Sequence, residues 1–131
     1  MRLFLVRHAE AAPGHPDELR PLTAAGREQA RALGERLAAE QPDLVLSSPL
    51  LRARETAAAI ARATGAELRI DERLAPGATL VGLLAAADGL PEPLVAVGHQ
   101  PDCGEIAAEL TGGAPPAYPP AGLAELELPL P

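Results

Sequence analysis

Short apolar runs alternate with longer amphipathic stretches along the whole chain. Runs rich in Leu and Val, of the length typical of buried strands, occur at residues 2–6, 43–46 and 94–97, and residues 66–70 are predicted to form a further strand. Stretches with apolar side chains at helical spacing occur at residues 24–40, 49–64, 79–88 and 103–110. Ala124, Leu126 and Leu128 alternate with glutamates, which predicts a strand with one solvent-facing side at or near a sheet edge. This alternation of strands and helices indicates an α/β fold with a largely parallel sheet.

Local sequence signals predict where the helices begin. Thr23 is a typical N-cap for the first helix, because its hydroxyl can accept a free amide of the first turn. We expect Ser48 to cap the second helix, with Pro49 in the first helical position. Asp102 and Glu105 have the spacing of a capping box, which predicts Asp102 as the cap of the fourth helix.

Three of the predicted strands are followed at once by polar side chains. Arg7 and His8 follow the first strand, the segment from Ser48 to Arg52 follows the second, and Gly98-His99 follows the fourth. In open α/β sheets the ligand crevice lies beyond the carboxyl ends of the strands. We therefore expect these groups to meet at one rim of the sheet, beside the N-terminus of the second helix.

Two arginines and two histidines at a helix N-terminus suit a dianionic ligand. A phosphoryl group fits best, since its oxygens accept paired hydrogen bonds from arginine, and a neutral imidazole can attack phosphorus to form a covalent phosphohistidine. Taken singly, each residue has a simpler interpretation: a polar strand end for Arg7-His8, a solvated helix residue for Arg52, a core histidine for His99. Three such groups at one rim favour a functional site.

Composition narrows the function classes. With 131 residues, 47% of them hydrophobic, the chain predicts a single domain over residues 1–131. A net charge of −7 argues against nucleic acid as a partner. We predict no membrane association and a cytoplasmic location, because no long apolar stretch occurs and the lone Cys103 fits a reducing compartment. The spacing of the histidines predicts neither a metal site nor a cofactor.

The motifs, taken in their order along the chain, resemble those of the histidine phosphatase superfamily, the phosphoglycerate-mutase-like enzymes. Arg7-His8-Ala9-Glu10 is similar to the Arg-His-Gly motif of this superfamily, and residues 22–26 are similar to its Leu-Thr-x-x-Gly helix start. Residues 48–56 are similar to its Ser-x-x-x-Arg-Ala-x-x-Thr segment. Gly98-His99 is similar to the segment that carries its second histidine. The resemblance extends to about residue 128. It implies a three-layer α/β/α fold with an antiparallel edge strand. It also implies that His8 is the nucleophile and that Arg7, Arg52 and His99 bind the phosphoryl group.

Within the superfamily the chain resembles the small SixA-type phosphohistidine phosphatases. Arg20-Pro21-Leu22-Thr23 and Gly98-His99-Gln100-Pro101 are like that branch, and the short connection from Ile70 to Leu94 leaves no room for an inserted lid domain. Ala9 departs from the pattern, because many members have Gly there. The chain also ends soon after the strand at Leu126–Leu128, and the sequence leaves open whether a final edge strand is missing.

Weaker candidates complete the predicted site. Arg20, Ser48 and Gln100 are expected to contact substrate, although Arg20 could equally face solvent. Glu72 is a candidate general acid, since larger family members carry a carboxylate after the corresponding strand. His15 is expected to lie on the surface.

Three functions remain open at this point. The first is a phosphatase that acts through phospho-His8 on phosphohistidine in proteins, favoured because a protonated imidazole leaves without a strong general acid. The second is a small-molecule phosphomonoesterase, and the third is a module that binds an oxyanion or phospho-ligand without turnover. The sequence identifies neither the substrate nor the oligomeric state.

Overall fold

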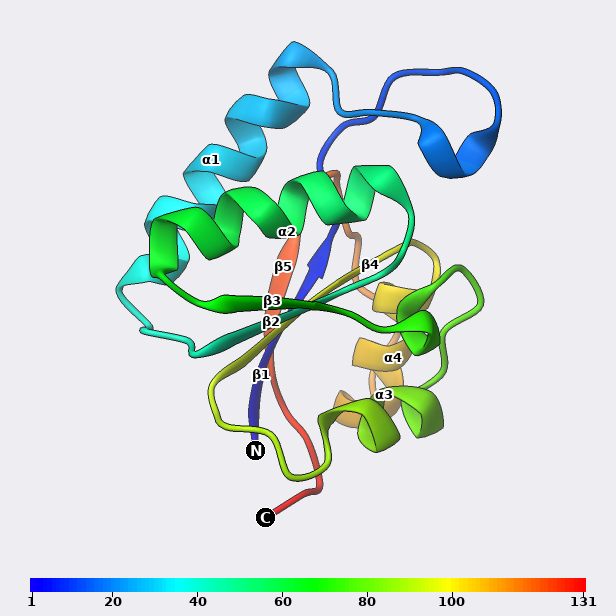
Figure 1. The fold of residues 1–131 in the computed structure, drawn as a ribbon. Helices are drawn as coiled ribbons and strands as arrows, with labels where there is room; N and C mark the ends of the chain where they lie inside the picture. Colours follow the sequence, from blue (N-terminus) through cyan, green and yellow to red (C-terminus); the bar gives the residue numbers. More distant parts are fainter.

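The computed structural model describes residues 1–131 and forms three layers (Figure 1). The strands are β1 (Arg2–Arg7), β2 (Leu44–Ser47), β3 (Glu67–Ile70), β4 (Leu94–Gly98) and β5 (Leu123–Glu127). The helices are α1 (Ala24–Ala38), α2 (Leu51–Thr64), α3 (Leu80–Ala87) and α4 (Asp102–Thr111), with short 3-10 turns η1 (Asp17–Leu19) and η2 (Glu72–Leu74). Helices α1 and α2 cover one face of the sheet, and α3 and α4 cover the other. This confirms the predicted α/β/α fold without a lid domain.

The sheet has five strands in the order β3-β2-β4-β1-β5. All neighbouring pairs are parallel except β1 with β5, which is antiparallel and puts the predicted antiparallel strand at the edge. Arg7 pairs with Gly98 and Ser47 pairs with Val97, so β1, β4 and β2 end at the same level. The residues that follow these three strands therefore emerge at one rim.

The central strands are apolar throughout because both of their faces are covered. In β1, Leu3 and Leu5 belong to the core beneath α3 and α4, whereas Phe4 and Val6 belong to the core beneath α1 and α2. Strands buried on both faces have continuous apolar runs, which is why they were identifiable from sequence. In β5, Leu126 is buried and the adjacent Glu125 and Glu127 are exposed, which confirms one solvent-facing side.

Two predicted helix starts were wrong. Helix α2 begins at Leu51 and its N-cap is Leu50, so Ser48 and Pro49 precede the helix. Asp102 is already the first residue of α4, and its carboxylate accepts the backbone N–H groups of Gly77 and Ala78 at 2.8 and 3.1 Å instead of capping the helix. In both cases a tertiary contact uses the side chain that the local signal assigned to a cap.

The predicted N-cap of the first helix is confirmed. The Thr23 hydroxyl accepts the N–H of Gly26 and caps α1. Gly65 ends α2 in the left-handed conformation, with φ of 77°.

None of the helices has both the length and the apolar character needed to cross a membrane.

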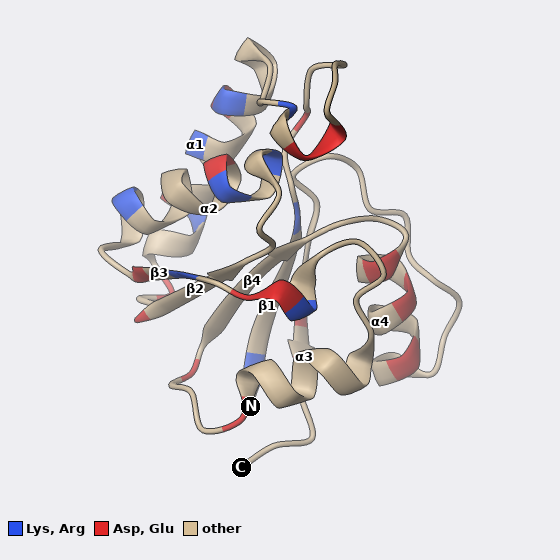
Figure 2. Ribbon diagram, turned by 45° about the vertical axis from the view of Figure 1, so that its right-hand side comes forward, with Lys and Arg blue, Asp and Glu red and all other residues tan.

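The charged side chains are unevenly distributed (Figure 2). The charged residues of α4 are all acidic, whereas arginines are spread over α1 and α2. Helices α1 and α2 carry six arginines and three glutamates, so positive charge exceeds negative charge on them although the whole chain has a net charge of −7.

Candidate active site

The two histidines that follow β1 and β4 face each other at the rim of the sheet. The N–H of His8 donates to the carbonyl of Gly98 at 3.0 Å, which extends the β1–β4 pairing by one residue. The rings of His8 and His99 are 5.2 Å apart between centroids and inclined at 58°. The predicted meeting of these strand ends is therefore present in the fold.

His8 is held with one ring nitrogen engaged. Its Nδ1 lies 2.7 Å from the carbonyl oxygen of Ala9, and because a carbonyl only accepts, Nδ1 carries the proton. Nε2 of the neutral ring then keeps its lone pair. Burial lowers the pKa of His8 below its ordinary value of 6.5, and the positive charges of Arg52, Arg7 and Arg20 lower it further. The ring of His8 is thus neutral near pH 7 and presents the lone pair of Nε2.

The segment that carries His8 is tied to helix α2. The N–H of Ala9 donates to the hydroxyl oxygen of Thr56 at 3.0 Å, and that hydroxyl donates to the carbonyl of Arg52 at 2.9 Å. Thr56 is fully buried. One buried side chain therefore connects the strand end that presents His8 with the helix turn that presents Arg52.

His99 is 3% exposed and bonded on one side only. Its Nε2 lies 2.7 Å from the hydroxyl oxygen of Ser48, while its Nδ1 is buried without a partner. Burial lowers the pKa of His99 to about 4, with further contributions from His8 and Arg52. The ring is therefore neutral near pH 7, and its Nδ1 is the nitrogen still available to a ligand.

The two predicted arginines are positioned by backbone carbonyls. Arg52 is 6% exposed, and its Nη1 donates to the carbonyl of Asp17 at 2.9 Å, so it is not a solvated helix residue. Nη1 of Arg7 donates to the carbonyl of Tyr118 at 2.8 Å. These contacts fix one end of each guanidinium and leave its Nε group without a hydrogen-bond partner.

Unpaired buried donors concentrate at this rim. Four buried side-chain nitrogens have no hydrogen-bond partner, and three of them are Nε of Arg7, Nε of Arg52 and Nδ1 of His99; the fourth is Nε of Arg54. Leaving such a group unsatisfied costs roughly 1–3 kcal/mol each. A tetrahedral oxyanion, which offers several acceptors at once, is the kind of ligand that would satisfy them.

The sequence did not single out Asp17, which lies between two of the arginines. Its carboxylate accepts from Nη2 of Arg52 at 3.3 Å and from Nη1 of Arg20 at 3.1 Å. Nε of Arg20 also donates to the carbonyl of Ala12 at 2.8 Å, so Arg20 is held on the loop before α1, with its side chain 29% exposed, instead of extending freely into solvent. The spacing of three positions between Asp17 and Arg20 was the sequence signal that could have indicated their ion pair.

The remaining candidates lie in different settings. Ser48 is fully buried against His99, and the side chain of Gln100 accepts the N–H of Gly104 at 2.8 Å in the first turn of α4. Glu72 is exposed in η2 and makes no hydrogen bond or ion pair with any predicted site residue. No cluster of three or more His, Cys, Asp and Glu side chains is arranged to hold a metal ion.

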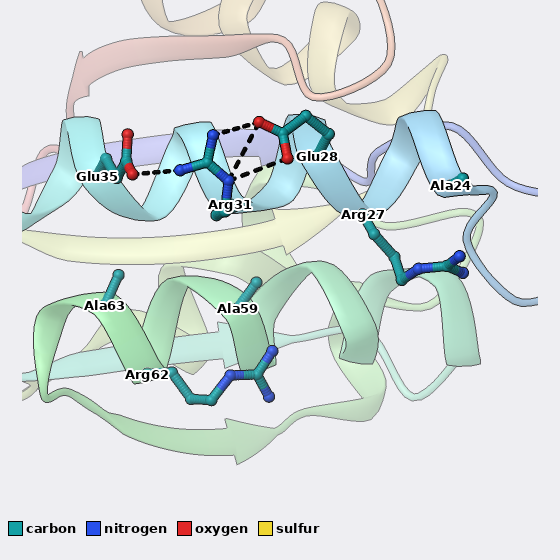
Figure 3. Close-up of a pocket in the computed structure, with 8 residues that line it drawn as sticks. All are labelled: Ala24, Arg27, Glu28, Arg31, Glu35, Ala59, Arg62 and Ala63. Atoms are coloured by element: carbon teal, nitrogen blue, oxygen red, sulfur yellow. Dashed lines mark hydrogen bonds and ion pairs between the residues drawn. The ribbon is translucent and has the colours of Figure 1, made fainter.

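The largest cavity lies elsewhere. A groove of about 620 Å³ runs between α1 and α2 (Figure 3), and no predicted site residue lines it. Arg31 on its wall is paired with Glu28 and Glu35. Arg27 and Arg62 line the same groove without an ion pair, but no nucleophile or buried histidine reaches it, and the predicted site residues stay at the strand ends.

Comparison with known proteins agrees with this geometry. The model of the histidine phosphatase superfamily (branch 1) matches residues 3–76. An uncharacterized protein of Picosynechococcus is 38% identical over 125 residues, covering 86% of this chain and 74% of its own. Probable phosphoglycerate mutase GpmB of Salmonella paratyphi C is 37% identical over 81 residues, or 56% of this chain, which spans only 37% of the length of that relative.

Solved structures extend the likeness to the complete fold. The protein histidine phosphatase SixA, complexed with tungstate, superposes with a TM-score of 0.84 at 27% identity and covers 95% of this chain and 86% of its own. A mycobacterial glucosyl-3-phosphoglycerate phosphatase, complexed with VO3, superposes with a TM-score of 0.74 at 25% identity and covers 96% and 90%. From its family match, its fold and its motifs, we conclude that this chain belongs to the histidine phosphatase superfamily.

Proposed function

We propose that this protein is a phosphatase that works through a covalent phosphohistidine on His8. The observation that carries the proposal is the free Nε2 of a neutral His8 beside unpaired buried nitrogens of Arg7, Arg52 and His99. A nucleophile with its lone pair free and donors for the phosphoryl oxygens are the two requirements of phosphoryl transfer.

The reaction has two steps. Nε2 of His8 attacks phosphorus, and the bond to the leaving group breaks with its electron pair going to the leaving group; a protonated imidazole then leaves as the neutral ring, whereas an alkoxide must also take up a proton. Water then attacks the phosphohistidine, the P–N bond breaks with its electrons returning to Nε2, and inorganic phosphate is released. Arg7 and Arg52 stabilise the charge on the phosphoryl oxygens in both steps, so we propose that no metal ion is needed.

The proposed substrate is phosphohistidine on a protein. An alkoxide leaving group needs a proton donor, and Glu72, the carboxylate predicted for that role, has no contact with the site. An imidazole that is already protonated leaves without that help. The connection between β3 and β4 holds only η2 and α3, which leaves the rim open to a macromolecule. The likeness to SixA supports the same substrate class.

A second candidate is a small-molecule phosphomonoesterase. It is supported by the likeness to a glucosyl-3-phosphoglycerate phosphatase, whose substrate is a sugar phosphate ester. The two candidates share the nucleophile and the anion site and differ only in the leaving group.

A comparison of kcat/KM across leaving groups tests the choice. The substrates are phosphohistidine, free and on a protein, an aryl phosphate, and the alkyl esters phosphoserine and a sugar phosphate. We expect phosphohistidine to be fastest, aryl phosphate intermediate and alkyl esters slowest. Glu72→Gln should change none of these rates more than the control Glu109→Gln, an exposed carboxylate on α4.

Each alternative has its own result. A sugar phosphate or phosphoserine as the best substrate, with that activity lost selectively in Glu72→Gln, would make the protein a phosphomonoesterase with Glu72 as its acid. Binding of phosphate with no turnover of any substrate, the aryl phosphate included, would make it a non-catalytic binding module.

A further inference from the structure

The hydrogen bond between Ser48 and His99 determines more than the orientation of the ring. Ser48 is fully buried, and its hydroxyl oxygen lies 2.7 Å from Nε2 of His99. The same oxygen accepts the backbone N–H of Leu50 at 3.2 Å. These are the two hydrogen-bond contacts of the Ser48 hydroxyl.

The direction of the bond follows from this pair of contacts. The Leu50 amide can only donate, so it uses an acceptor position of the hydroxyl and leaves the hydroxyl proton to be placed. A buried hydroxyl proton needs an acceptor, and Nε2 of His99 is the acceptor within reach. Nε2 of a neutral ring that accepts this proton must carry a lone pair, and the ring proton then lies on Nδ1.

We propose that Ser48 is a positioning residue that holds neutral His99 in the tautomer protonated on Nδ1, so that Nδ1 donates a hydrogen bond to the phosphoryl group. This inference rests on the proposed function for the identity of the acceptor. It assigns Ser48 a role through His99 in place of the direct substrate contact expected from the sequence.

The tautomer decides whether the contact of His99 with a phosphoryl oxygen is attractive. With the proton on Nδ1, the buried and unpaired Nδ1 is a donor toward an anion. With the proton on Nε2, Nδ1 would present a lone pair to the same anion. A ring protonated on both nitrogens would also donate from Nδ1. Because the pKa of His99 is lowered to about 4, that form is not the main one near pH 7. The Ser48 hydroxyl, and not a positive charge on the ring, therefore selects the form of His99 in which Nδ1 is a donor.

The test is nitrogen-15 NMR of the imidazole rings in the full chain at pH 7, which distinguishes a protonated ring nitrogen from one with a lone pair. We expect Nδ1 of His99 to be protonated in the wild-type protein and the Nε2-protonated form to grow in Ser48→Ala. Loss of one donor to the transition state predicts a fall in kcat of about a hundredfold with aryl phosphate, and a smaller change in KM. Ser48→Thr, which keeps a hydroxyl, should restore much of the rate.

The matched control is Ser47→Ala. Ser47 is also fully buried, but its hydroxyl donates to the carbonyl of Ser48 and does not contact His99. The control should keep the wild-type tautomer and a kcat within a fewfold of wild type.

Wild-type His99 protonated on Nε2 would overturn the proposal, and this measurement needs no variant to fold. An unchanged tautomer and kcat in a folded Ser48→Ala would overturn it as well. Failure of the proposed function is a separate result, because a chain that turns over no phosphorylated substrate still reports its tautomer in the NMR spectrum.

Discussion

Asp17 contacts Arg52 through two of its oxygens: its carbonyl accepts from Nη1 at 2.9 Å and its carboxylate accepts from Nη2 at 3.3 Å. The same carboxylate also accepts from Arg20. The Asp17 carboxylate thus bridges two arginines beside His8 and His99. It makes the kind of contact with the arginines that the proposed oxyanion ligand would make. An incoming phosphoryl group therefore competes with Asp17 for Arg52.

Asp17→Asn should tighten the binding of anionic inhibitors such as phosphate and tungstate. The side chain of Asp17 is 60% exposed and its ion pair is screened by solvent, so we expect its loss to lower the inhibition constant by no more than about fivefold. Glu18→Gln is the control, because Glu18 is the adjacent carboxylate and makes no ion pair with the arginines. Weaker inhibition in Asp17→Asn would mean that Asp17 orients Arg52 more than it competes for it.

The lowered pKa values of the histidines predict how stability depends on pH. In the unfolded chain a histidine binds a proton below about pH 6.5, whereas folded His99 does so only near pH 4. Between these values the unfolded state binds more protons, so the free energy of unfolding should fall as the pH drops from about 6.5 to about 4. Urea unfolding at several pH values measures this, and His99→Gln should flatten the dependence. A free energy of unfolding that rises as the pH drops over this interval would contradict the burial of neutral histidines.

Activity should follow the same direction. His8 must be neutral to attack, and burial together with Arg52 and Arg7 lowers its pKa. We expect the acidic limb of kcat, after correction for titration of the substrate phosphate, to lie below pH 6.5. An NMR titration that places His8 above 6.5 would show that the site is less buried and less cationic in solution.

Gly26→Ala should destabilise the protein. An added Cβ at Gly26 would lie 2.0 Å from the carbonyl oxygen of Glu10, so the start of α1 and the segment after His8 would have to separate. Overpacking of this kind costs about 1–3 kcal/mol in the free energy of unfolding, measured by urea denaturation. Gly113→Ala is the control, since its Cβ would meet only the Thr111 hydroxyl at 3.9 Å. Equal stability of the two variants would contradict the close approach.

A chelator should leave turnover intact. The positive charge that phosphoryl transfer requires comes from Arg7 and Arg52, which are fixed by Tyr118 and Asp17. The rate with aryl phosphate after exhaustive treatment with EDTA measures this directly. Complete loss of activity, restored by one divalent metal, would overturn the assignment of charge stabilisation to the arginines.

The sheet was predictable because each strand carries its own signal. The buried strands are apolar on both faces, and Leu126 in β5 alternates with exposed glutamates, so local pattern and tertiary environment agree. The meeting of His8 with His99 followed from one general rule about strand ends. Their separation of 91 positions along the chain did not matter once both followed neighbouring parallel strands.

The partners of the site residues were not predictable in this way. Asp17 is an exposed acid in the short turn η1, and nothing near it in the sequence indicates its contact with Arg52, which lies 35 positions later. The errors at Ser48 and Asp102 have the same origin. Each is a good capping residue locally, but its side chain contacts residues at least 24 positions away.

The central claim is that the phosphoryl group passes through Nε2 of His8, and trapping that intermediate tests it most directly. The protein is mixed with a phosphorus-labelled substrate, quenched in denaturant at alkaline pH, and digested for mass spectrometry. His8→Ala and His15→Ala are treated alongside, His15 being an exposed histidine in the loop before η1. The account predicts one phosphoryl group on His8, labile in acid, present in wild type and His15→Ala and absent in His8→Ala. Label on another residue, or turnover by His8→Ala above a tenth of the wild-type rate, would contradict it.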